Sequence, residues 1–218
     1  ICEKIIFPSY NILDNYDRIC NIKDKYYSKI IVTDHPDIMI NYDCINIKFI
    51  DDVINIAFLG YFCDYKGSDL FRLLLYTNRY IGNYKIIYHV FGNISDDERS
   101  KILIDDQIIY HNNYKDENII EILNKNKIHG ITHLSIFEES YCYALSYSIN
   151  SGIPLFYINH GSLSERLSDN DRFYPTNLDD MDENFKQFLN YIISNNGVTN
   201  NIQKISKIQN KKWYIENY

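Results

Sequence analysis

The chain has 218 residues and a mass of 26.0 kDa, which is enough for one large domain or two small ones. Apolar residues make up 45% of the sequence and charged residues 23%, which excludes a disordered chain and indicates a globular protein with a core. The 22 basic residues against 29 acidic ones give a net charge of −7, which argues against a broad basic surface for nucleic acid.

Seven short apolar runs rich in β-branched residues predict β-strands. In chain order they are Lys4–Phe7, Lys29–Val32, Ile54–Leu59, Lys85–Phe91, Gln107–Tyr110, Ile131–Ile136 and Ile153–Ile158. Amphipathic segments predict helices that begin near Ser68, Asp116 and Tyr143 and that cover Glu183–Ser194 and Ile202–Trp213. We expect Ser68 and Asp69 to cap the first of these helices.

Strands that alternate with helices predict an α/β fold, namely a doubly wound, Rossmann-like parallel sheet with helices on both faces. We place a boundary near Asp51–Asp52, before the first strand of the main sheet. Residues 1–50 would then be a connecting βαβ segment, and residues 51–218 the main domain. Ligands of such sheets bind at the carboxyl ends of the strands, so the residues that follow each strand are the candidates for a site.

The five cysteines occur singly, at Cys2, Cys20, Cys44, Cys63 and Cys142. They lack the CxxC spacing of a structural zinc motif, and their odd number argues against a disulfide framework. No apolar run approaches the ~20 residues of a membrane span, and no signal-peptide pattern opens the chain. We therefore expect no metal site, no membrane span and a reducing, cytoplasmic location.

The loop after the predicted strand Ile54–Leu59 contains the elements of a phosphate site. Gly60 ends the strand, where a glycine lets a ligand approach the backbone, and Lys66 and Gly67 precede the next helix. A helix N-terminus together with an ammonium group attracts phosphate. An ordinary strand-to-helix loop with a surface lysine is the alternative. The sequence has neither GxGxxG nor GxxxxGK[ST], so an NAD fingerprint and a Walker loop are both excluded.

A second candidate site follows the predicted strand Ile131–Ile136, where Glu138 and Glu139 precede a helix. In the functional interpretation, Glu139 accepts hydrogen bonds from sugar hydroxyls while the N–H groups of residues 141–143 hold a phosphate. In the alternative, the two acids only cap the helix, because negative charge is favourable at that end. After the next strand, His160 either contacts a ligand or is structural.

These stretches, taken in order, resemble a known family. They are Lys66-Gly67-Ser68-Asp69, Phe91-Gly92, Glu139-Ser140-Tyr141-Cys142-Tyr143-Ala144-Leu145-Ser146, Gly152-Ile153-Pro154 and Gly161-Ser162-Leu163-Ser164-Glu165-Arg166. The pattern looks like the C-terminal, nucleotide-sugar-binding half of GT-B glycosyltransferases, and within them the large retaining family 4 that includes sucrose synthases. The stretch 135–166 is similar to a rhamnosyltransferase-like branch of that family. The resemblance covers roughly residues 4–195, and Phe7-Pro8-Ser9 and His35-Pro36-Asp37 look like its inter-half segment.

The resemblance implies a role for individual residues. Lys66 would contact the donor diphosphate, and Glu139 would bind the donor sugar as the first acid of the family's Glu-(seven residues)-Glu motif. Tyr147 stands where the second, ribose-binding acid is expected, and Tyr61 where an arginine is common. The loop that ends at Tyr114 resembles the stretch that flanks the base. The implied donor-binding residues are Gly60, Lys66, Gly67, Tyr114, Glu139, Ser140, Tyr141, Cys142, Tyr143 and Tyr147.

The resemblance also implies a glycosyltransferase in which Glu139 and Lys66 are the catalytic residues. The donor would be a nucleotide-diphosphate sugar, the acceptor a glycan, protein or lipid, and no other cofactor or metal would be needed. The acceptor site would belong to an N-terminal half in a longer chain. Two alternatives stay open: a degenerate domain that binds a nucleotide-sugar or a protein without catalysis, and another GT-B enzyme such as a sugar-nucleotide epimerase.

Overall fold

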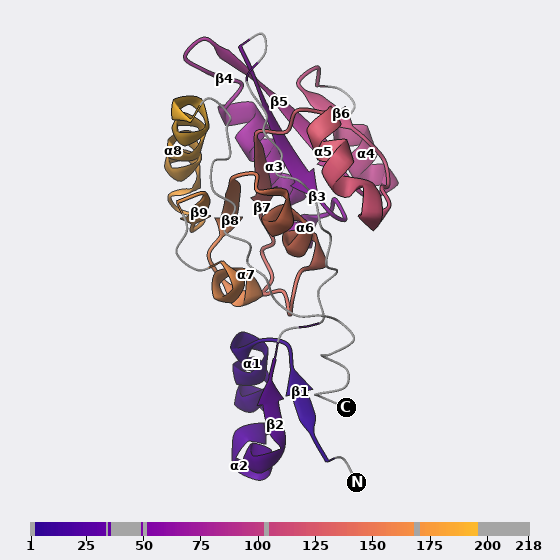
Figure 1. The fold of residues 1–218 in the computed structure, drawn as a ribbon, viewed down its shortest axis with the longest axis vertical. Helices are drawn as coiled ribbons and strands as arrows, with labels where there is room; N and C mark the ends of the chain where they lie inside the picture. The colour runs from indigo at the N-terminus through magenta and orange to yellow at the C-terminus, as the bar shows by residue number, and fades with distance from the viewer. Residues whose placement is uncertain are drawn as a thin grey trace.

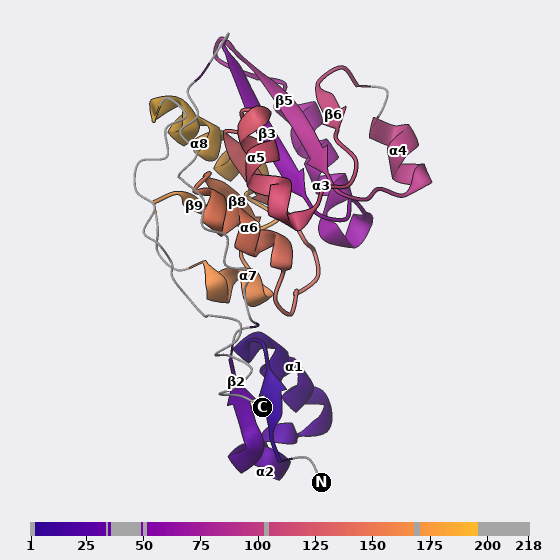
Figure 2. The same ribbon diagram turned by 45° about the vertical axis from the view of Figure 1, so that its right-hand side comes forward.

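The computed structural model describes residues 3–33, 35, 49, 52–102, 105–167 and 171–195. They form a small N-terminal unit and a larger α/β unit, which lie end to end (Figures 1 and 2). Several sequence predictions lie outside the described residues: the helix Ile202–Trp213, Asp51 at the boundary, Pro36 and Asp37, and Cys2 and Cys44. The division into residues 1–50 and 51–218 stays a prediction.

The small unit is a parallel βαβ arrangement. Strand β1 (Ile5–Phe7) pairs in parallel with β2 (Ile30–Val32), so both predicted strands are confirmed. The Oγ of Ser9 accepts a hydrogen bond from the N–H of Ile12 at 3.3 Å and starts the first helix, as a serine N-cap does. The elements between the strands are α1 (Tyr10–Cys20), α2 (Ile22–Tyr26) and the 3₁₀ turn η1 (Tyr27–Lys29).

The larger unit is built on a seven-stranded mixed sheet. Its main strands follow the spatial order β6-β5-β3-β7-β8-β9 with parallel pairing, and β4 adds an antiparallel pair with β5. In chain order this is 3-2-1-4-5-6, the doubly wound order, so the predicted fold class is confirmed. The strands are β3 (Val53–Leu59), β4 (Tyr80–Ile81), β5 (Tyr84–Phe91), β6 (Ile108–Tyr110), β7 (Gly130–His133), β8 (Leu155–Ile158) and β9 (Phe173–Thr176).

Helices cover both faces of this sheet, which is why its central strands are continuously apolar. Alternate residues of β3 point to opposite faces: Ala57 and Leu59 join one core cluster, and Ile56 and Phe58 the other. Helices α5, α6 and α7 pack in the first cluster, and α3 and α8 in the second. The helices are α3 (Ser68–Thr77), α4 (Asp96–Ile102), α5 (Ile119–Lys125), α6 (Tyr143–Ser151), α7 (Gly161–Arg166) and α8 (Met181–Ser194), with 3₁₀ turns η2 (Asp64–Lys66) and η3 (Asp116–Asn118).

The structure differs from the sequence prediction at several elements. Strand β9 was not predicted because it contains Pro175, which cannot donate to a ladder and is tolerated on an edge strand. Helix α4 was not predicted because it is mostly charged and buries little beyond Ile102 and Glu98. The capping prediction for Ser68 was wrong: Gly67 is the N-cap of α3, and the Oγ of Ser68 donates to Asp64 Oδ1 at 3.3 Å instead.

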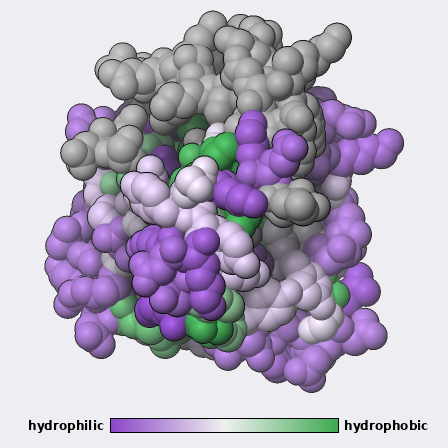
Figure 3. Space-filling model, turned by 90° about the horizontal axis from the view of Figure 1, so that it is seen from below, coloured by the Kyte–Doolittle hydropathy of each residue, from purple (hydrophilic) through white to green (hydrophobic). Residues whose placement is uncertain are grey.

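On the face seen from below, hydrophilic residues dominate and the hydrophobic ones form small separate spots (Figure 3). Within the described part of the chain, every helix falls short of the combined length and apolar character that a bilayer crossing requires. The described cysteines, Cys20, Cys63 and Cys142, carry free thiols.

Candidate functional site

A cavity of about 120 Å³ opens at the carboxyl ends of β3 and β7. These two strands are neighbours in the sheet, but they are the first and the fourth of its six parallel strands in chain order. The chain therefore continues from β3 toward one edge of the sheet and from β7 toward the other edge. Such a switch point leaves a crevice between the loops that leave the two strands. Of the residues predicted for the site, Gly60, Lys66, Glu139, Cys142 and Tyr143 line this cavity.

The two residues predicted as catalytic form an ion pair in the cavity. The Nζ of Lys66 lies 2.6 Å from the Oε2 of Glu139. Their side chains are 30% and 12% exposed, so the pair is partly sheltered but remains reachable from solvent. The cavity wall therefore presents a cation and a carboxylate side by side.

Gly67 allows this pair to form. Its φ of +87° is left-handed, and a Cβ at this position would lie 2.1 Å from the carbonyl oxygen of Leu134. Only glycine accepts both the conformation and the close approach. Gly67 does not line the cavity; it lets the Lys66 loop press against the end of β7, which brings Lys66 within reach of Glu139.

The loops after β3 and β7 are joined by hydrogen bonds. The Oγ of Ser135 lies 3.2 Å from the carbonyl oxygen of Tyr65, and the N–H of Ile136 donates to the same oxygen at 3.1 Å. His160 Nε2 lies 2.7 Å from the carbonyl oxygen of Ser135, and His160 is not among the lining residues. His160 therefore has a structural role, because its ring contacts the loop after β7 and does not line the cavity.

Neither acid of the second loop caps the following helix. Helix α6 has Cys142 as its N-cap residue, with φ +62° and without a side-chain cap. Glu139 pairs with Lys66 instead, and the Oε2 of Glu138 accepts a hydrogen bond from Asn15 Nδ2 at 2.8 Å. Hydrogen-bonded capping by the two acids is therefore not seen, and Tyr143 and Ala144 of the first turn of α6 line the cavity, where the N-cap residue Cys142 provides no side-chain cap.

The Cys142 thiol at the cavity wall stays protonated. Burial and the nearby negative charge of Glu139 raise the pKa of Cys142 to about 12. A thiol with so high a pKa is a poor nucleophile at neutral pH, because the thiolate is the reactive form. The side chain of Cys142 therefore forms part of the cavity wall and does not act as a nucleophile.

The other predicted donor residues lie away from the cavity lining. Tyr141 and Tyr147 are both 3% exposed, and Tyr147 belongs to the core beneath α6. Tyr114 packs against the same core, where burial raises its pKa to about 12. Ser140 is exposed on the loop before α6. Donor contacts by these four residues stay predictions.

Eight lining residues were not predicted for the site, and four of them carry polar groups: Tyr61, Thr132, His133 and Ser135. All four lie at the end of β3 or β7, so strand-end position was the available signal. His133 Nε2 lies 2.8 Å from the Oγ of Ser148, behind the cavity. Burial lowers the pKa of His133 to about 4, so its ring is neutral at pH 7.

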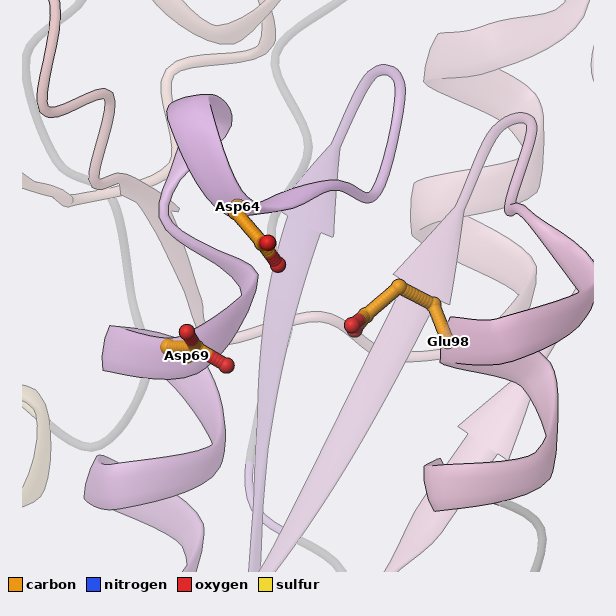
Figure 4. A group of neighbouring side chains, drawn as sticks. All are labelled: Asp64, Asp69 and Glu98. Atoms are coloured by element: carbon orange, nitrogen blue, oxygen red, sulfur yellow. The ribbon is translucent and has the colours of Figure 1, made fainter.

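A separate group of carboxylates lies beside α3. Asp64, Asp69 and Glu98 point toward one another (Figure 4), and one oxygen of each lies within 4.8 Å of the others. The guanidinium of Arg72 pairs with both Asp69 and Glu98, and Lys101 Nζ lies 2.8 Å from Glu98 Oε1. Although burial alone would raise the pKa of Glu98, hydrogen bonds from Lys101 and Arg72 lower it. Two of the three carboxylates, Asp69 and Glu98, are thus already paired with the chain's own cations.

Comparison with known proteins identifies the fold. No family model matches the sequence, and no curated protein matches it. Among solved structures, the apo form of the lipopolysaccharide outer core galactosyltransferase WaaB is 16% identical, with a TM-score of 0.61 over 88% of this chain and 53% of WaaB. HepE from Anabaena, in complex with UDP and glucose, is 11% identical, with a TM-score of 0.66 over 90% of this chain and 55% of HepE.

TarM from S. aureus, whose complex contains UDP, is 14% identical, with a TM-score of 0.62 over 89% of this chain and 39% of TarM. These likenesses show that the chain has the α/β fold of GT-B glycosyltransferases. The chain spans about half the length of WaaB and HepE and less of TarM.

Proposed function

We propose that the chain is the donor-binding half of a GT-B glycosyltransferase and that its cavity holds a nucleotide-diphosphate sugar. The observation that carries the proposal is the pairing of Lys66 with Glu139 at the switch point of the sheet. A cation and a carboxylate side by side suit a ligand that presents an anion and hydroxyl groups in one molecule. The UDP and glucose in the HepE complex and the UDP in the TarM complex support such a donor.

The diphosphate would bind between Lys66 and the first turn of α6. Breaking the bond from the anomeric carbon to the leaving diphosphate places additional negative charge on a phosphate oxygen. The ammonium of Lys66 and the uncapped N–H groups of α6 would offset this charge without moving, which is the most effective form of electrostatic catalysis. In this proposal the chain supplies the positive charge itself and needs no metal ion.

The sugar would bind against Glu139. When the diphosphate engages Lys66, the carboxylate of Glu139 gains acceptor sites for sugar hydroxyls. Hydrogen bonds of this kind orient the anomeric carbon for attack by the acceptor. Lys66 and Glu139 would therefore have separate tasks: the first binds the leaving group, and the second positions the group to be transferred.

We also propose the finer assignment to the retaining family 4-like group and its rhamnosyltransferase-like branch. The support is the sequence resemblance over residues 135–166, of which five residues between Ser135 and Ala144 line the cavity. An acceptor glycan, protein or lipid would bind an N-terminal half, and the coverage of about half of WaaB and HepE is compatible with such a partner.

A domain that binds a nucleotide-sugar without catalysis is the second candidate. The observation in its favour is Tyr147, which replaces the ribose-binding acid of the family and is buried in the core. Both candidates require the same cavity to bind a nucleotide-sugar. They differ only in whether the sugar is transferred.

Two assays test the proposal. Calorimetric titration of the chain with UDP, ADP, GDP and their glucose conjugates should give saturable binding of at least one nucleotide. Detection of released nucleoside diphosphate, with the chain in its full-length context and an acceptor mixture, then distinguishes the transferase from the binding domain. Absence of binding by every nucleotide in the series would contradict both candidates.

A further inference from the structure

Two pairs of consecutive residues connect the donor cavity with the small N-terminal unit. The first pair is Glu138 and Glu139, in the loop between β7 and α6. The second is Glu165 and Arg166, at the end of α7. In each pair, one side chain contacts α1 and the other contacts the cavity or the loop that forms its wall.

The residues that face α1 bind its first turns. Glu165 accepts hydrogen bonds from the backbone N–H groups of Tyr10 and Asn11, at 2.9 Å to Oε2 and 2.6 Å to Oε1. The first N–H groups of a helix have no partner within the helix, so Glu165 caps α1 from the other unit. Glu138 adds its bond with Asn15. Helix α7 faces α1 across this junction in both ribbon views (Figures 1 and 2).

The neighbouring residue, Arg166, holds the loop of the donor cavity. Its Nη1 donates to the carbonyl oxygens of Tyr141 and Cys142 at 2.6 and 2.9 Å, and its Nη2 lies 2.7 Å from the Oγ of Ser146. The guanidinium also lies 3.9 Å from the centroid of the Tyr141 ring. Because Cys142 has a positive φ, which is costly for a residue with a side chain, these bonds support a conformation that the loop alone would disfavour.

The start of α7 presses on the same loop. A Cβ at Gly161 would lie 3.0 Å from Glu138 Cα, so only a glycine fits here comfortably. The N–H of Ser162 donates to the carbonyl oxygen of Glu139 at 3.2 Å. Helix α7 therefore holds the loop at both ends, at Glu139 by its first turn and at Cys142 by Arg166.

We propose that Glu165 and Arg166 are positioning residues for donor binding, through which the docking of α1 and the affinity of the cavity for a nucleoside diphosphate depend on each other. Arg166 fixes the loop that presents Glu139 and the first turn of α6, and Glu165 fixes α7 to α1. The inference rests on the proposed function. Since coupling between two binding events is reciprocal, nucleotide binding must tighten the docking of α1 by the factor by which docking tightens nucleotide binding.

Hydrogen exchange tests the docking without reference to activity. In Glu165→Gln, which keeps the shape of the side chain and removes its charge, the amides of Tyr10 and Asn11 should exchange roughly tenfold faster. Glu121→Gln, on the exposed side of α5, is the matched control and should leave these amides unchanged. Unchanged exchange in Glu165→Gln would overturn the docking role of Glu165.

Calorimetry tests the coupling. Glu165→Gln should weaken UDP binding roughly threefold and Arg166→Lys roughly tenfold, although neither residue lines the cavity and Lys retains the charge. Saturating UDP should in turn slow exchange at Tyr10 and Asn11 in the unmodified chain. The denaturant midpoint of each variant shows that it is folded, and Glu165→Gln provides the test if Arg166→Lys is not.

The outcomes separate the two proposals. Wild-type affinity for UDP in both folded variants, or exchange at Tyr10 and Asn11 that UDP does not slow, would overturn the coupling and leave the proposed function standing. If the unmodified chain binds none of UDP, ADP and GDP, the proposed function fails and the coupling fails with it.

Discussion

Two ion pairs lie beside α3, and they differ in their surroundings. Arg72 and Glu98 are 10% and 4% exposed in their side chains, and Asp69 and Lys101 complete their contacts. Lys66 and Glu139 are 30% and 12% exposed and form part of a cavity wall. A buried pair whose members are fully engaged holds the structure together, whereas an accessible pair can exchange its internal contact for a ligand.

The largest effect is expected from breaking the buried pair. Glu98→Ala leaves Arg72 buried without its main partner, and the loss of one member of such a pair costs about 3–5 kcal/mol. Chemical denaturation should show this loss in the free energy of unfolding. Under conditions where the variant is folded, nucleotide affinity should be close to that of the wild type. An unchanged free energy of unfolding in Glu98→Ala would contradict the structural role of this pair.

Breaking the accessible pair should affect binding instead. Lys66→Ala should weaken binding of a nucleoside diphosphate by about 1.5–3 kcal/mol, since a charge-assisted hydrogen bond is lost. The change in the free energy of unfolding should be below about 1 kcal/mol, as for other exposed pairs. Calorimetry measures the first and denaturation the second. Lys125→Ala, at the exposed end of α5, is the control that should change neither.

The third prediction concerns His133 and the pH dependence of the free energy of unfolding. Its folded-state pKa of about 4 lies below the ordinary value of 6.5, so between these values the unfolded chain binds a proton that the folded chain excludes. Its contribution to stability is therefore fully present above about pH 6.5 and is lost as the pH falls toward 4. We expect about 2 kcal/mol less from His133 at about pH 5 than at about pH 7. His133→Gln should reduce the pH dependence of unfolding by that amount; an unchanged profile would contradict the lowered pKa.

The smallest effect concerns Tyr147. If the Tyr147 hydroxyl takes the place of the acid that the family resemblance leads us to expect at the ribose, Tyr147→Phe should weaken nucleotide binding by about 0.5–1.5 kcal/mol, the value of a neutral hydrogen bond. Its burial in the core favours packing, which predicts unchanged affinity. A decrease within the stated range would require the ribose to reach α6 and would contradict the packing role.

The sheet could be predicted because its strands are short apolar runs rich in β-branched residues. All seven predicted runs contain strands of the structure. The two strands that were not predicted are β4, which has only two residues, and β9, which contains Pro175. The charged helix α4 has no apolar stripe from which it could be recognised. The local sequence pattern therefore predicted the strands of the core. It did not predict elements that are short, that contain a proline or that are mostly charged.

The site could be predicted only in part, because its geometry depends on contacts between distant loops. Lys66 and Glu139 could be predicted because each follows a strand. The ion pair between them depends on the close approach of Gly67 to Leu134, which no local sequence pattern encodes. The sequence also could not divide the roles of Glu138 and Glu139. That division follows from the docking of α1, which takes Glu138 away from the cavity.

The central claim, that the accessible pair is the donor site, is tested most directly by titrating Glu139→Gln with UDP and with UDP-glucose. If Glu139 binds the sugar and competes with phosphate for Lys66, the variant should bind UDP at least as tightly as the wild type. Its affinity for UDP-glucose should fall roughly tenfold relative to its affinity for UDP. An equal change for the two ligands, or no change for either, would contradict the claim.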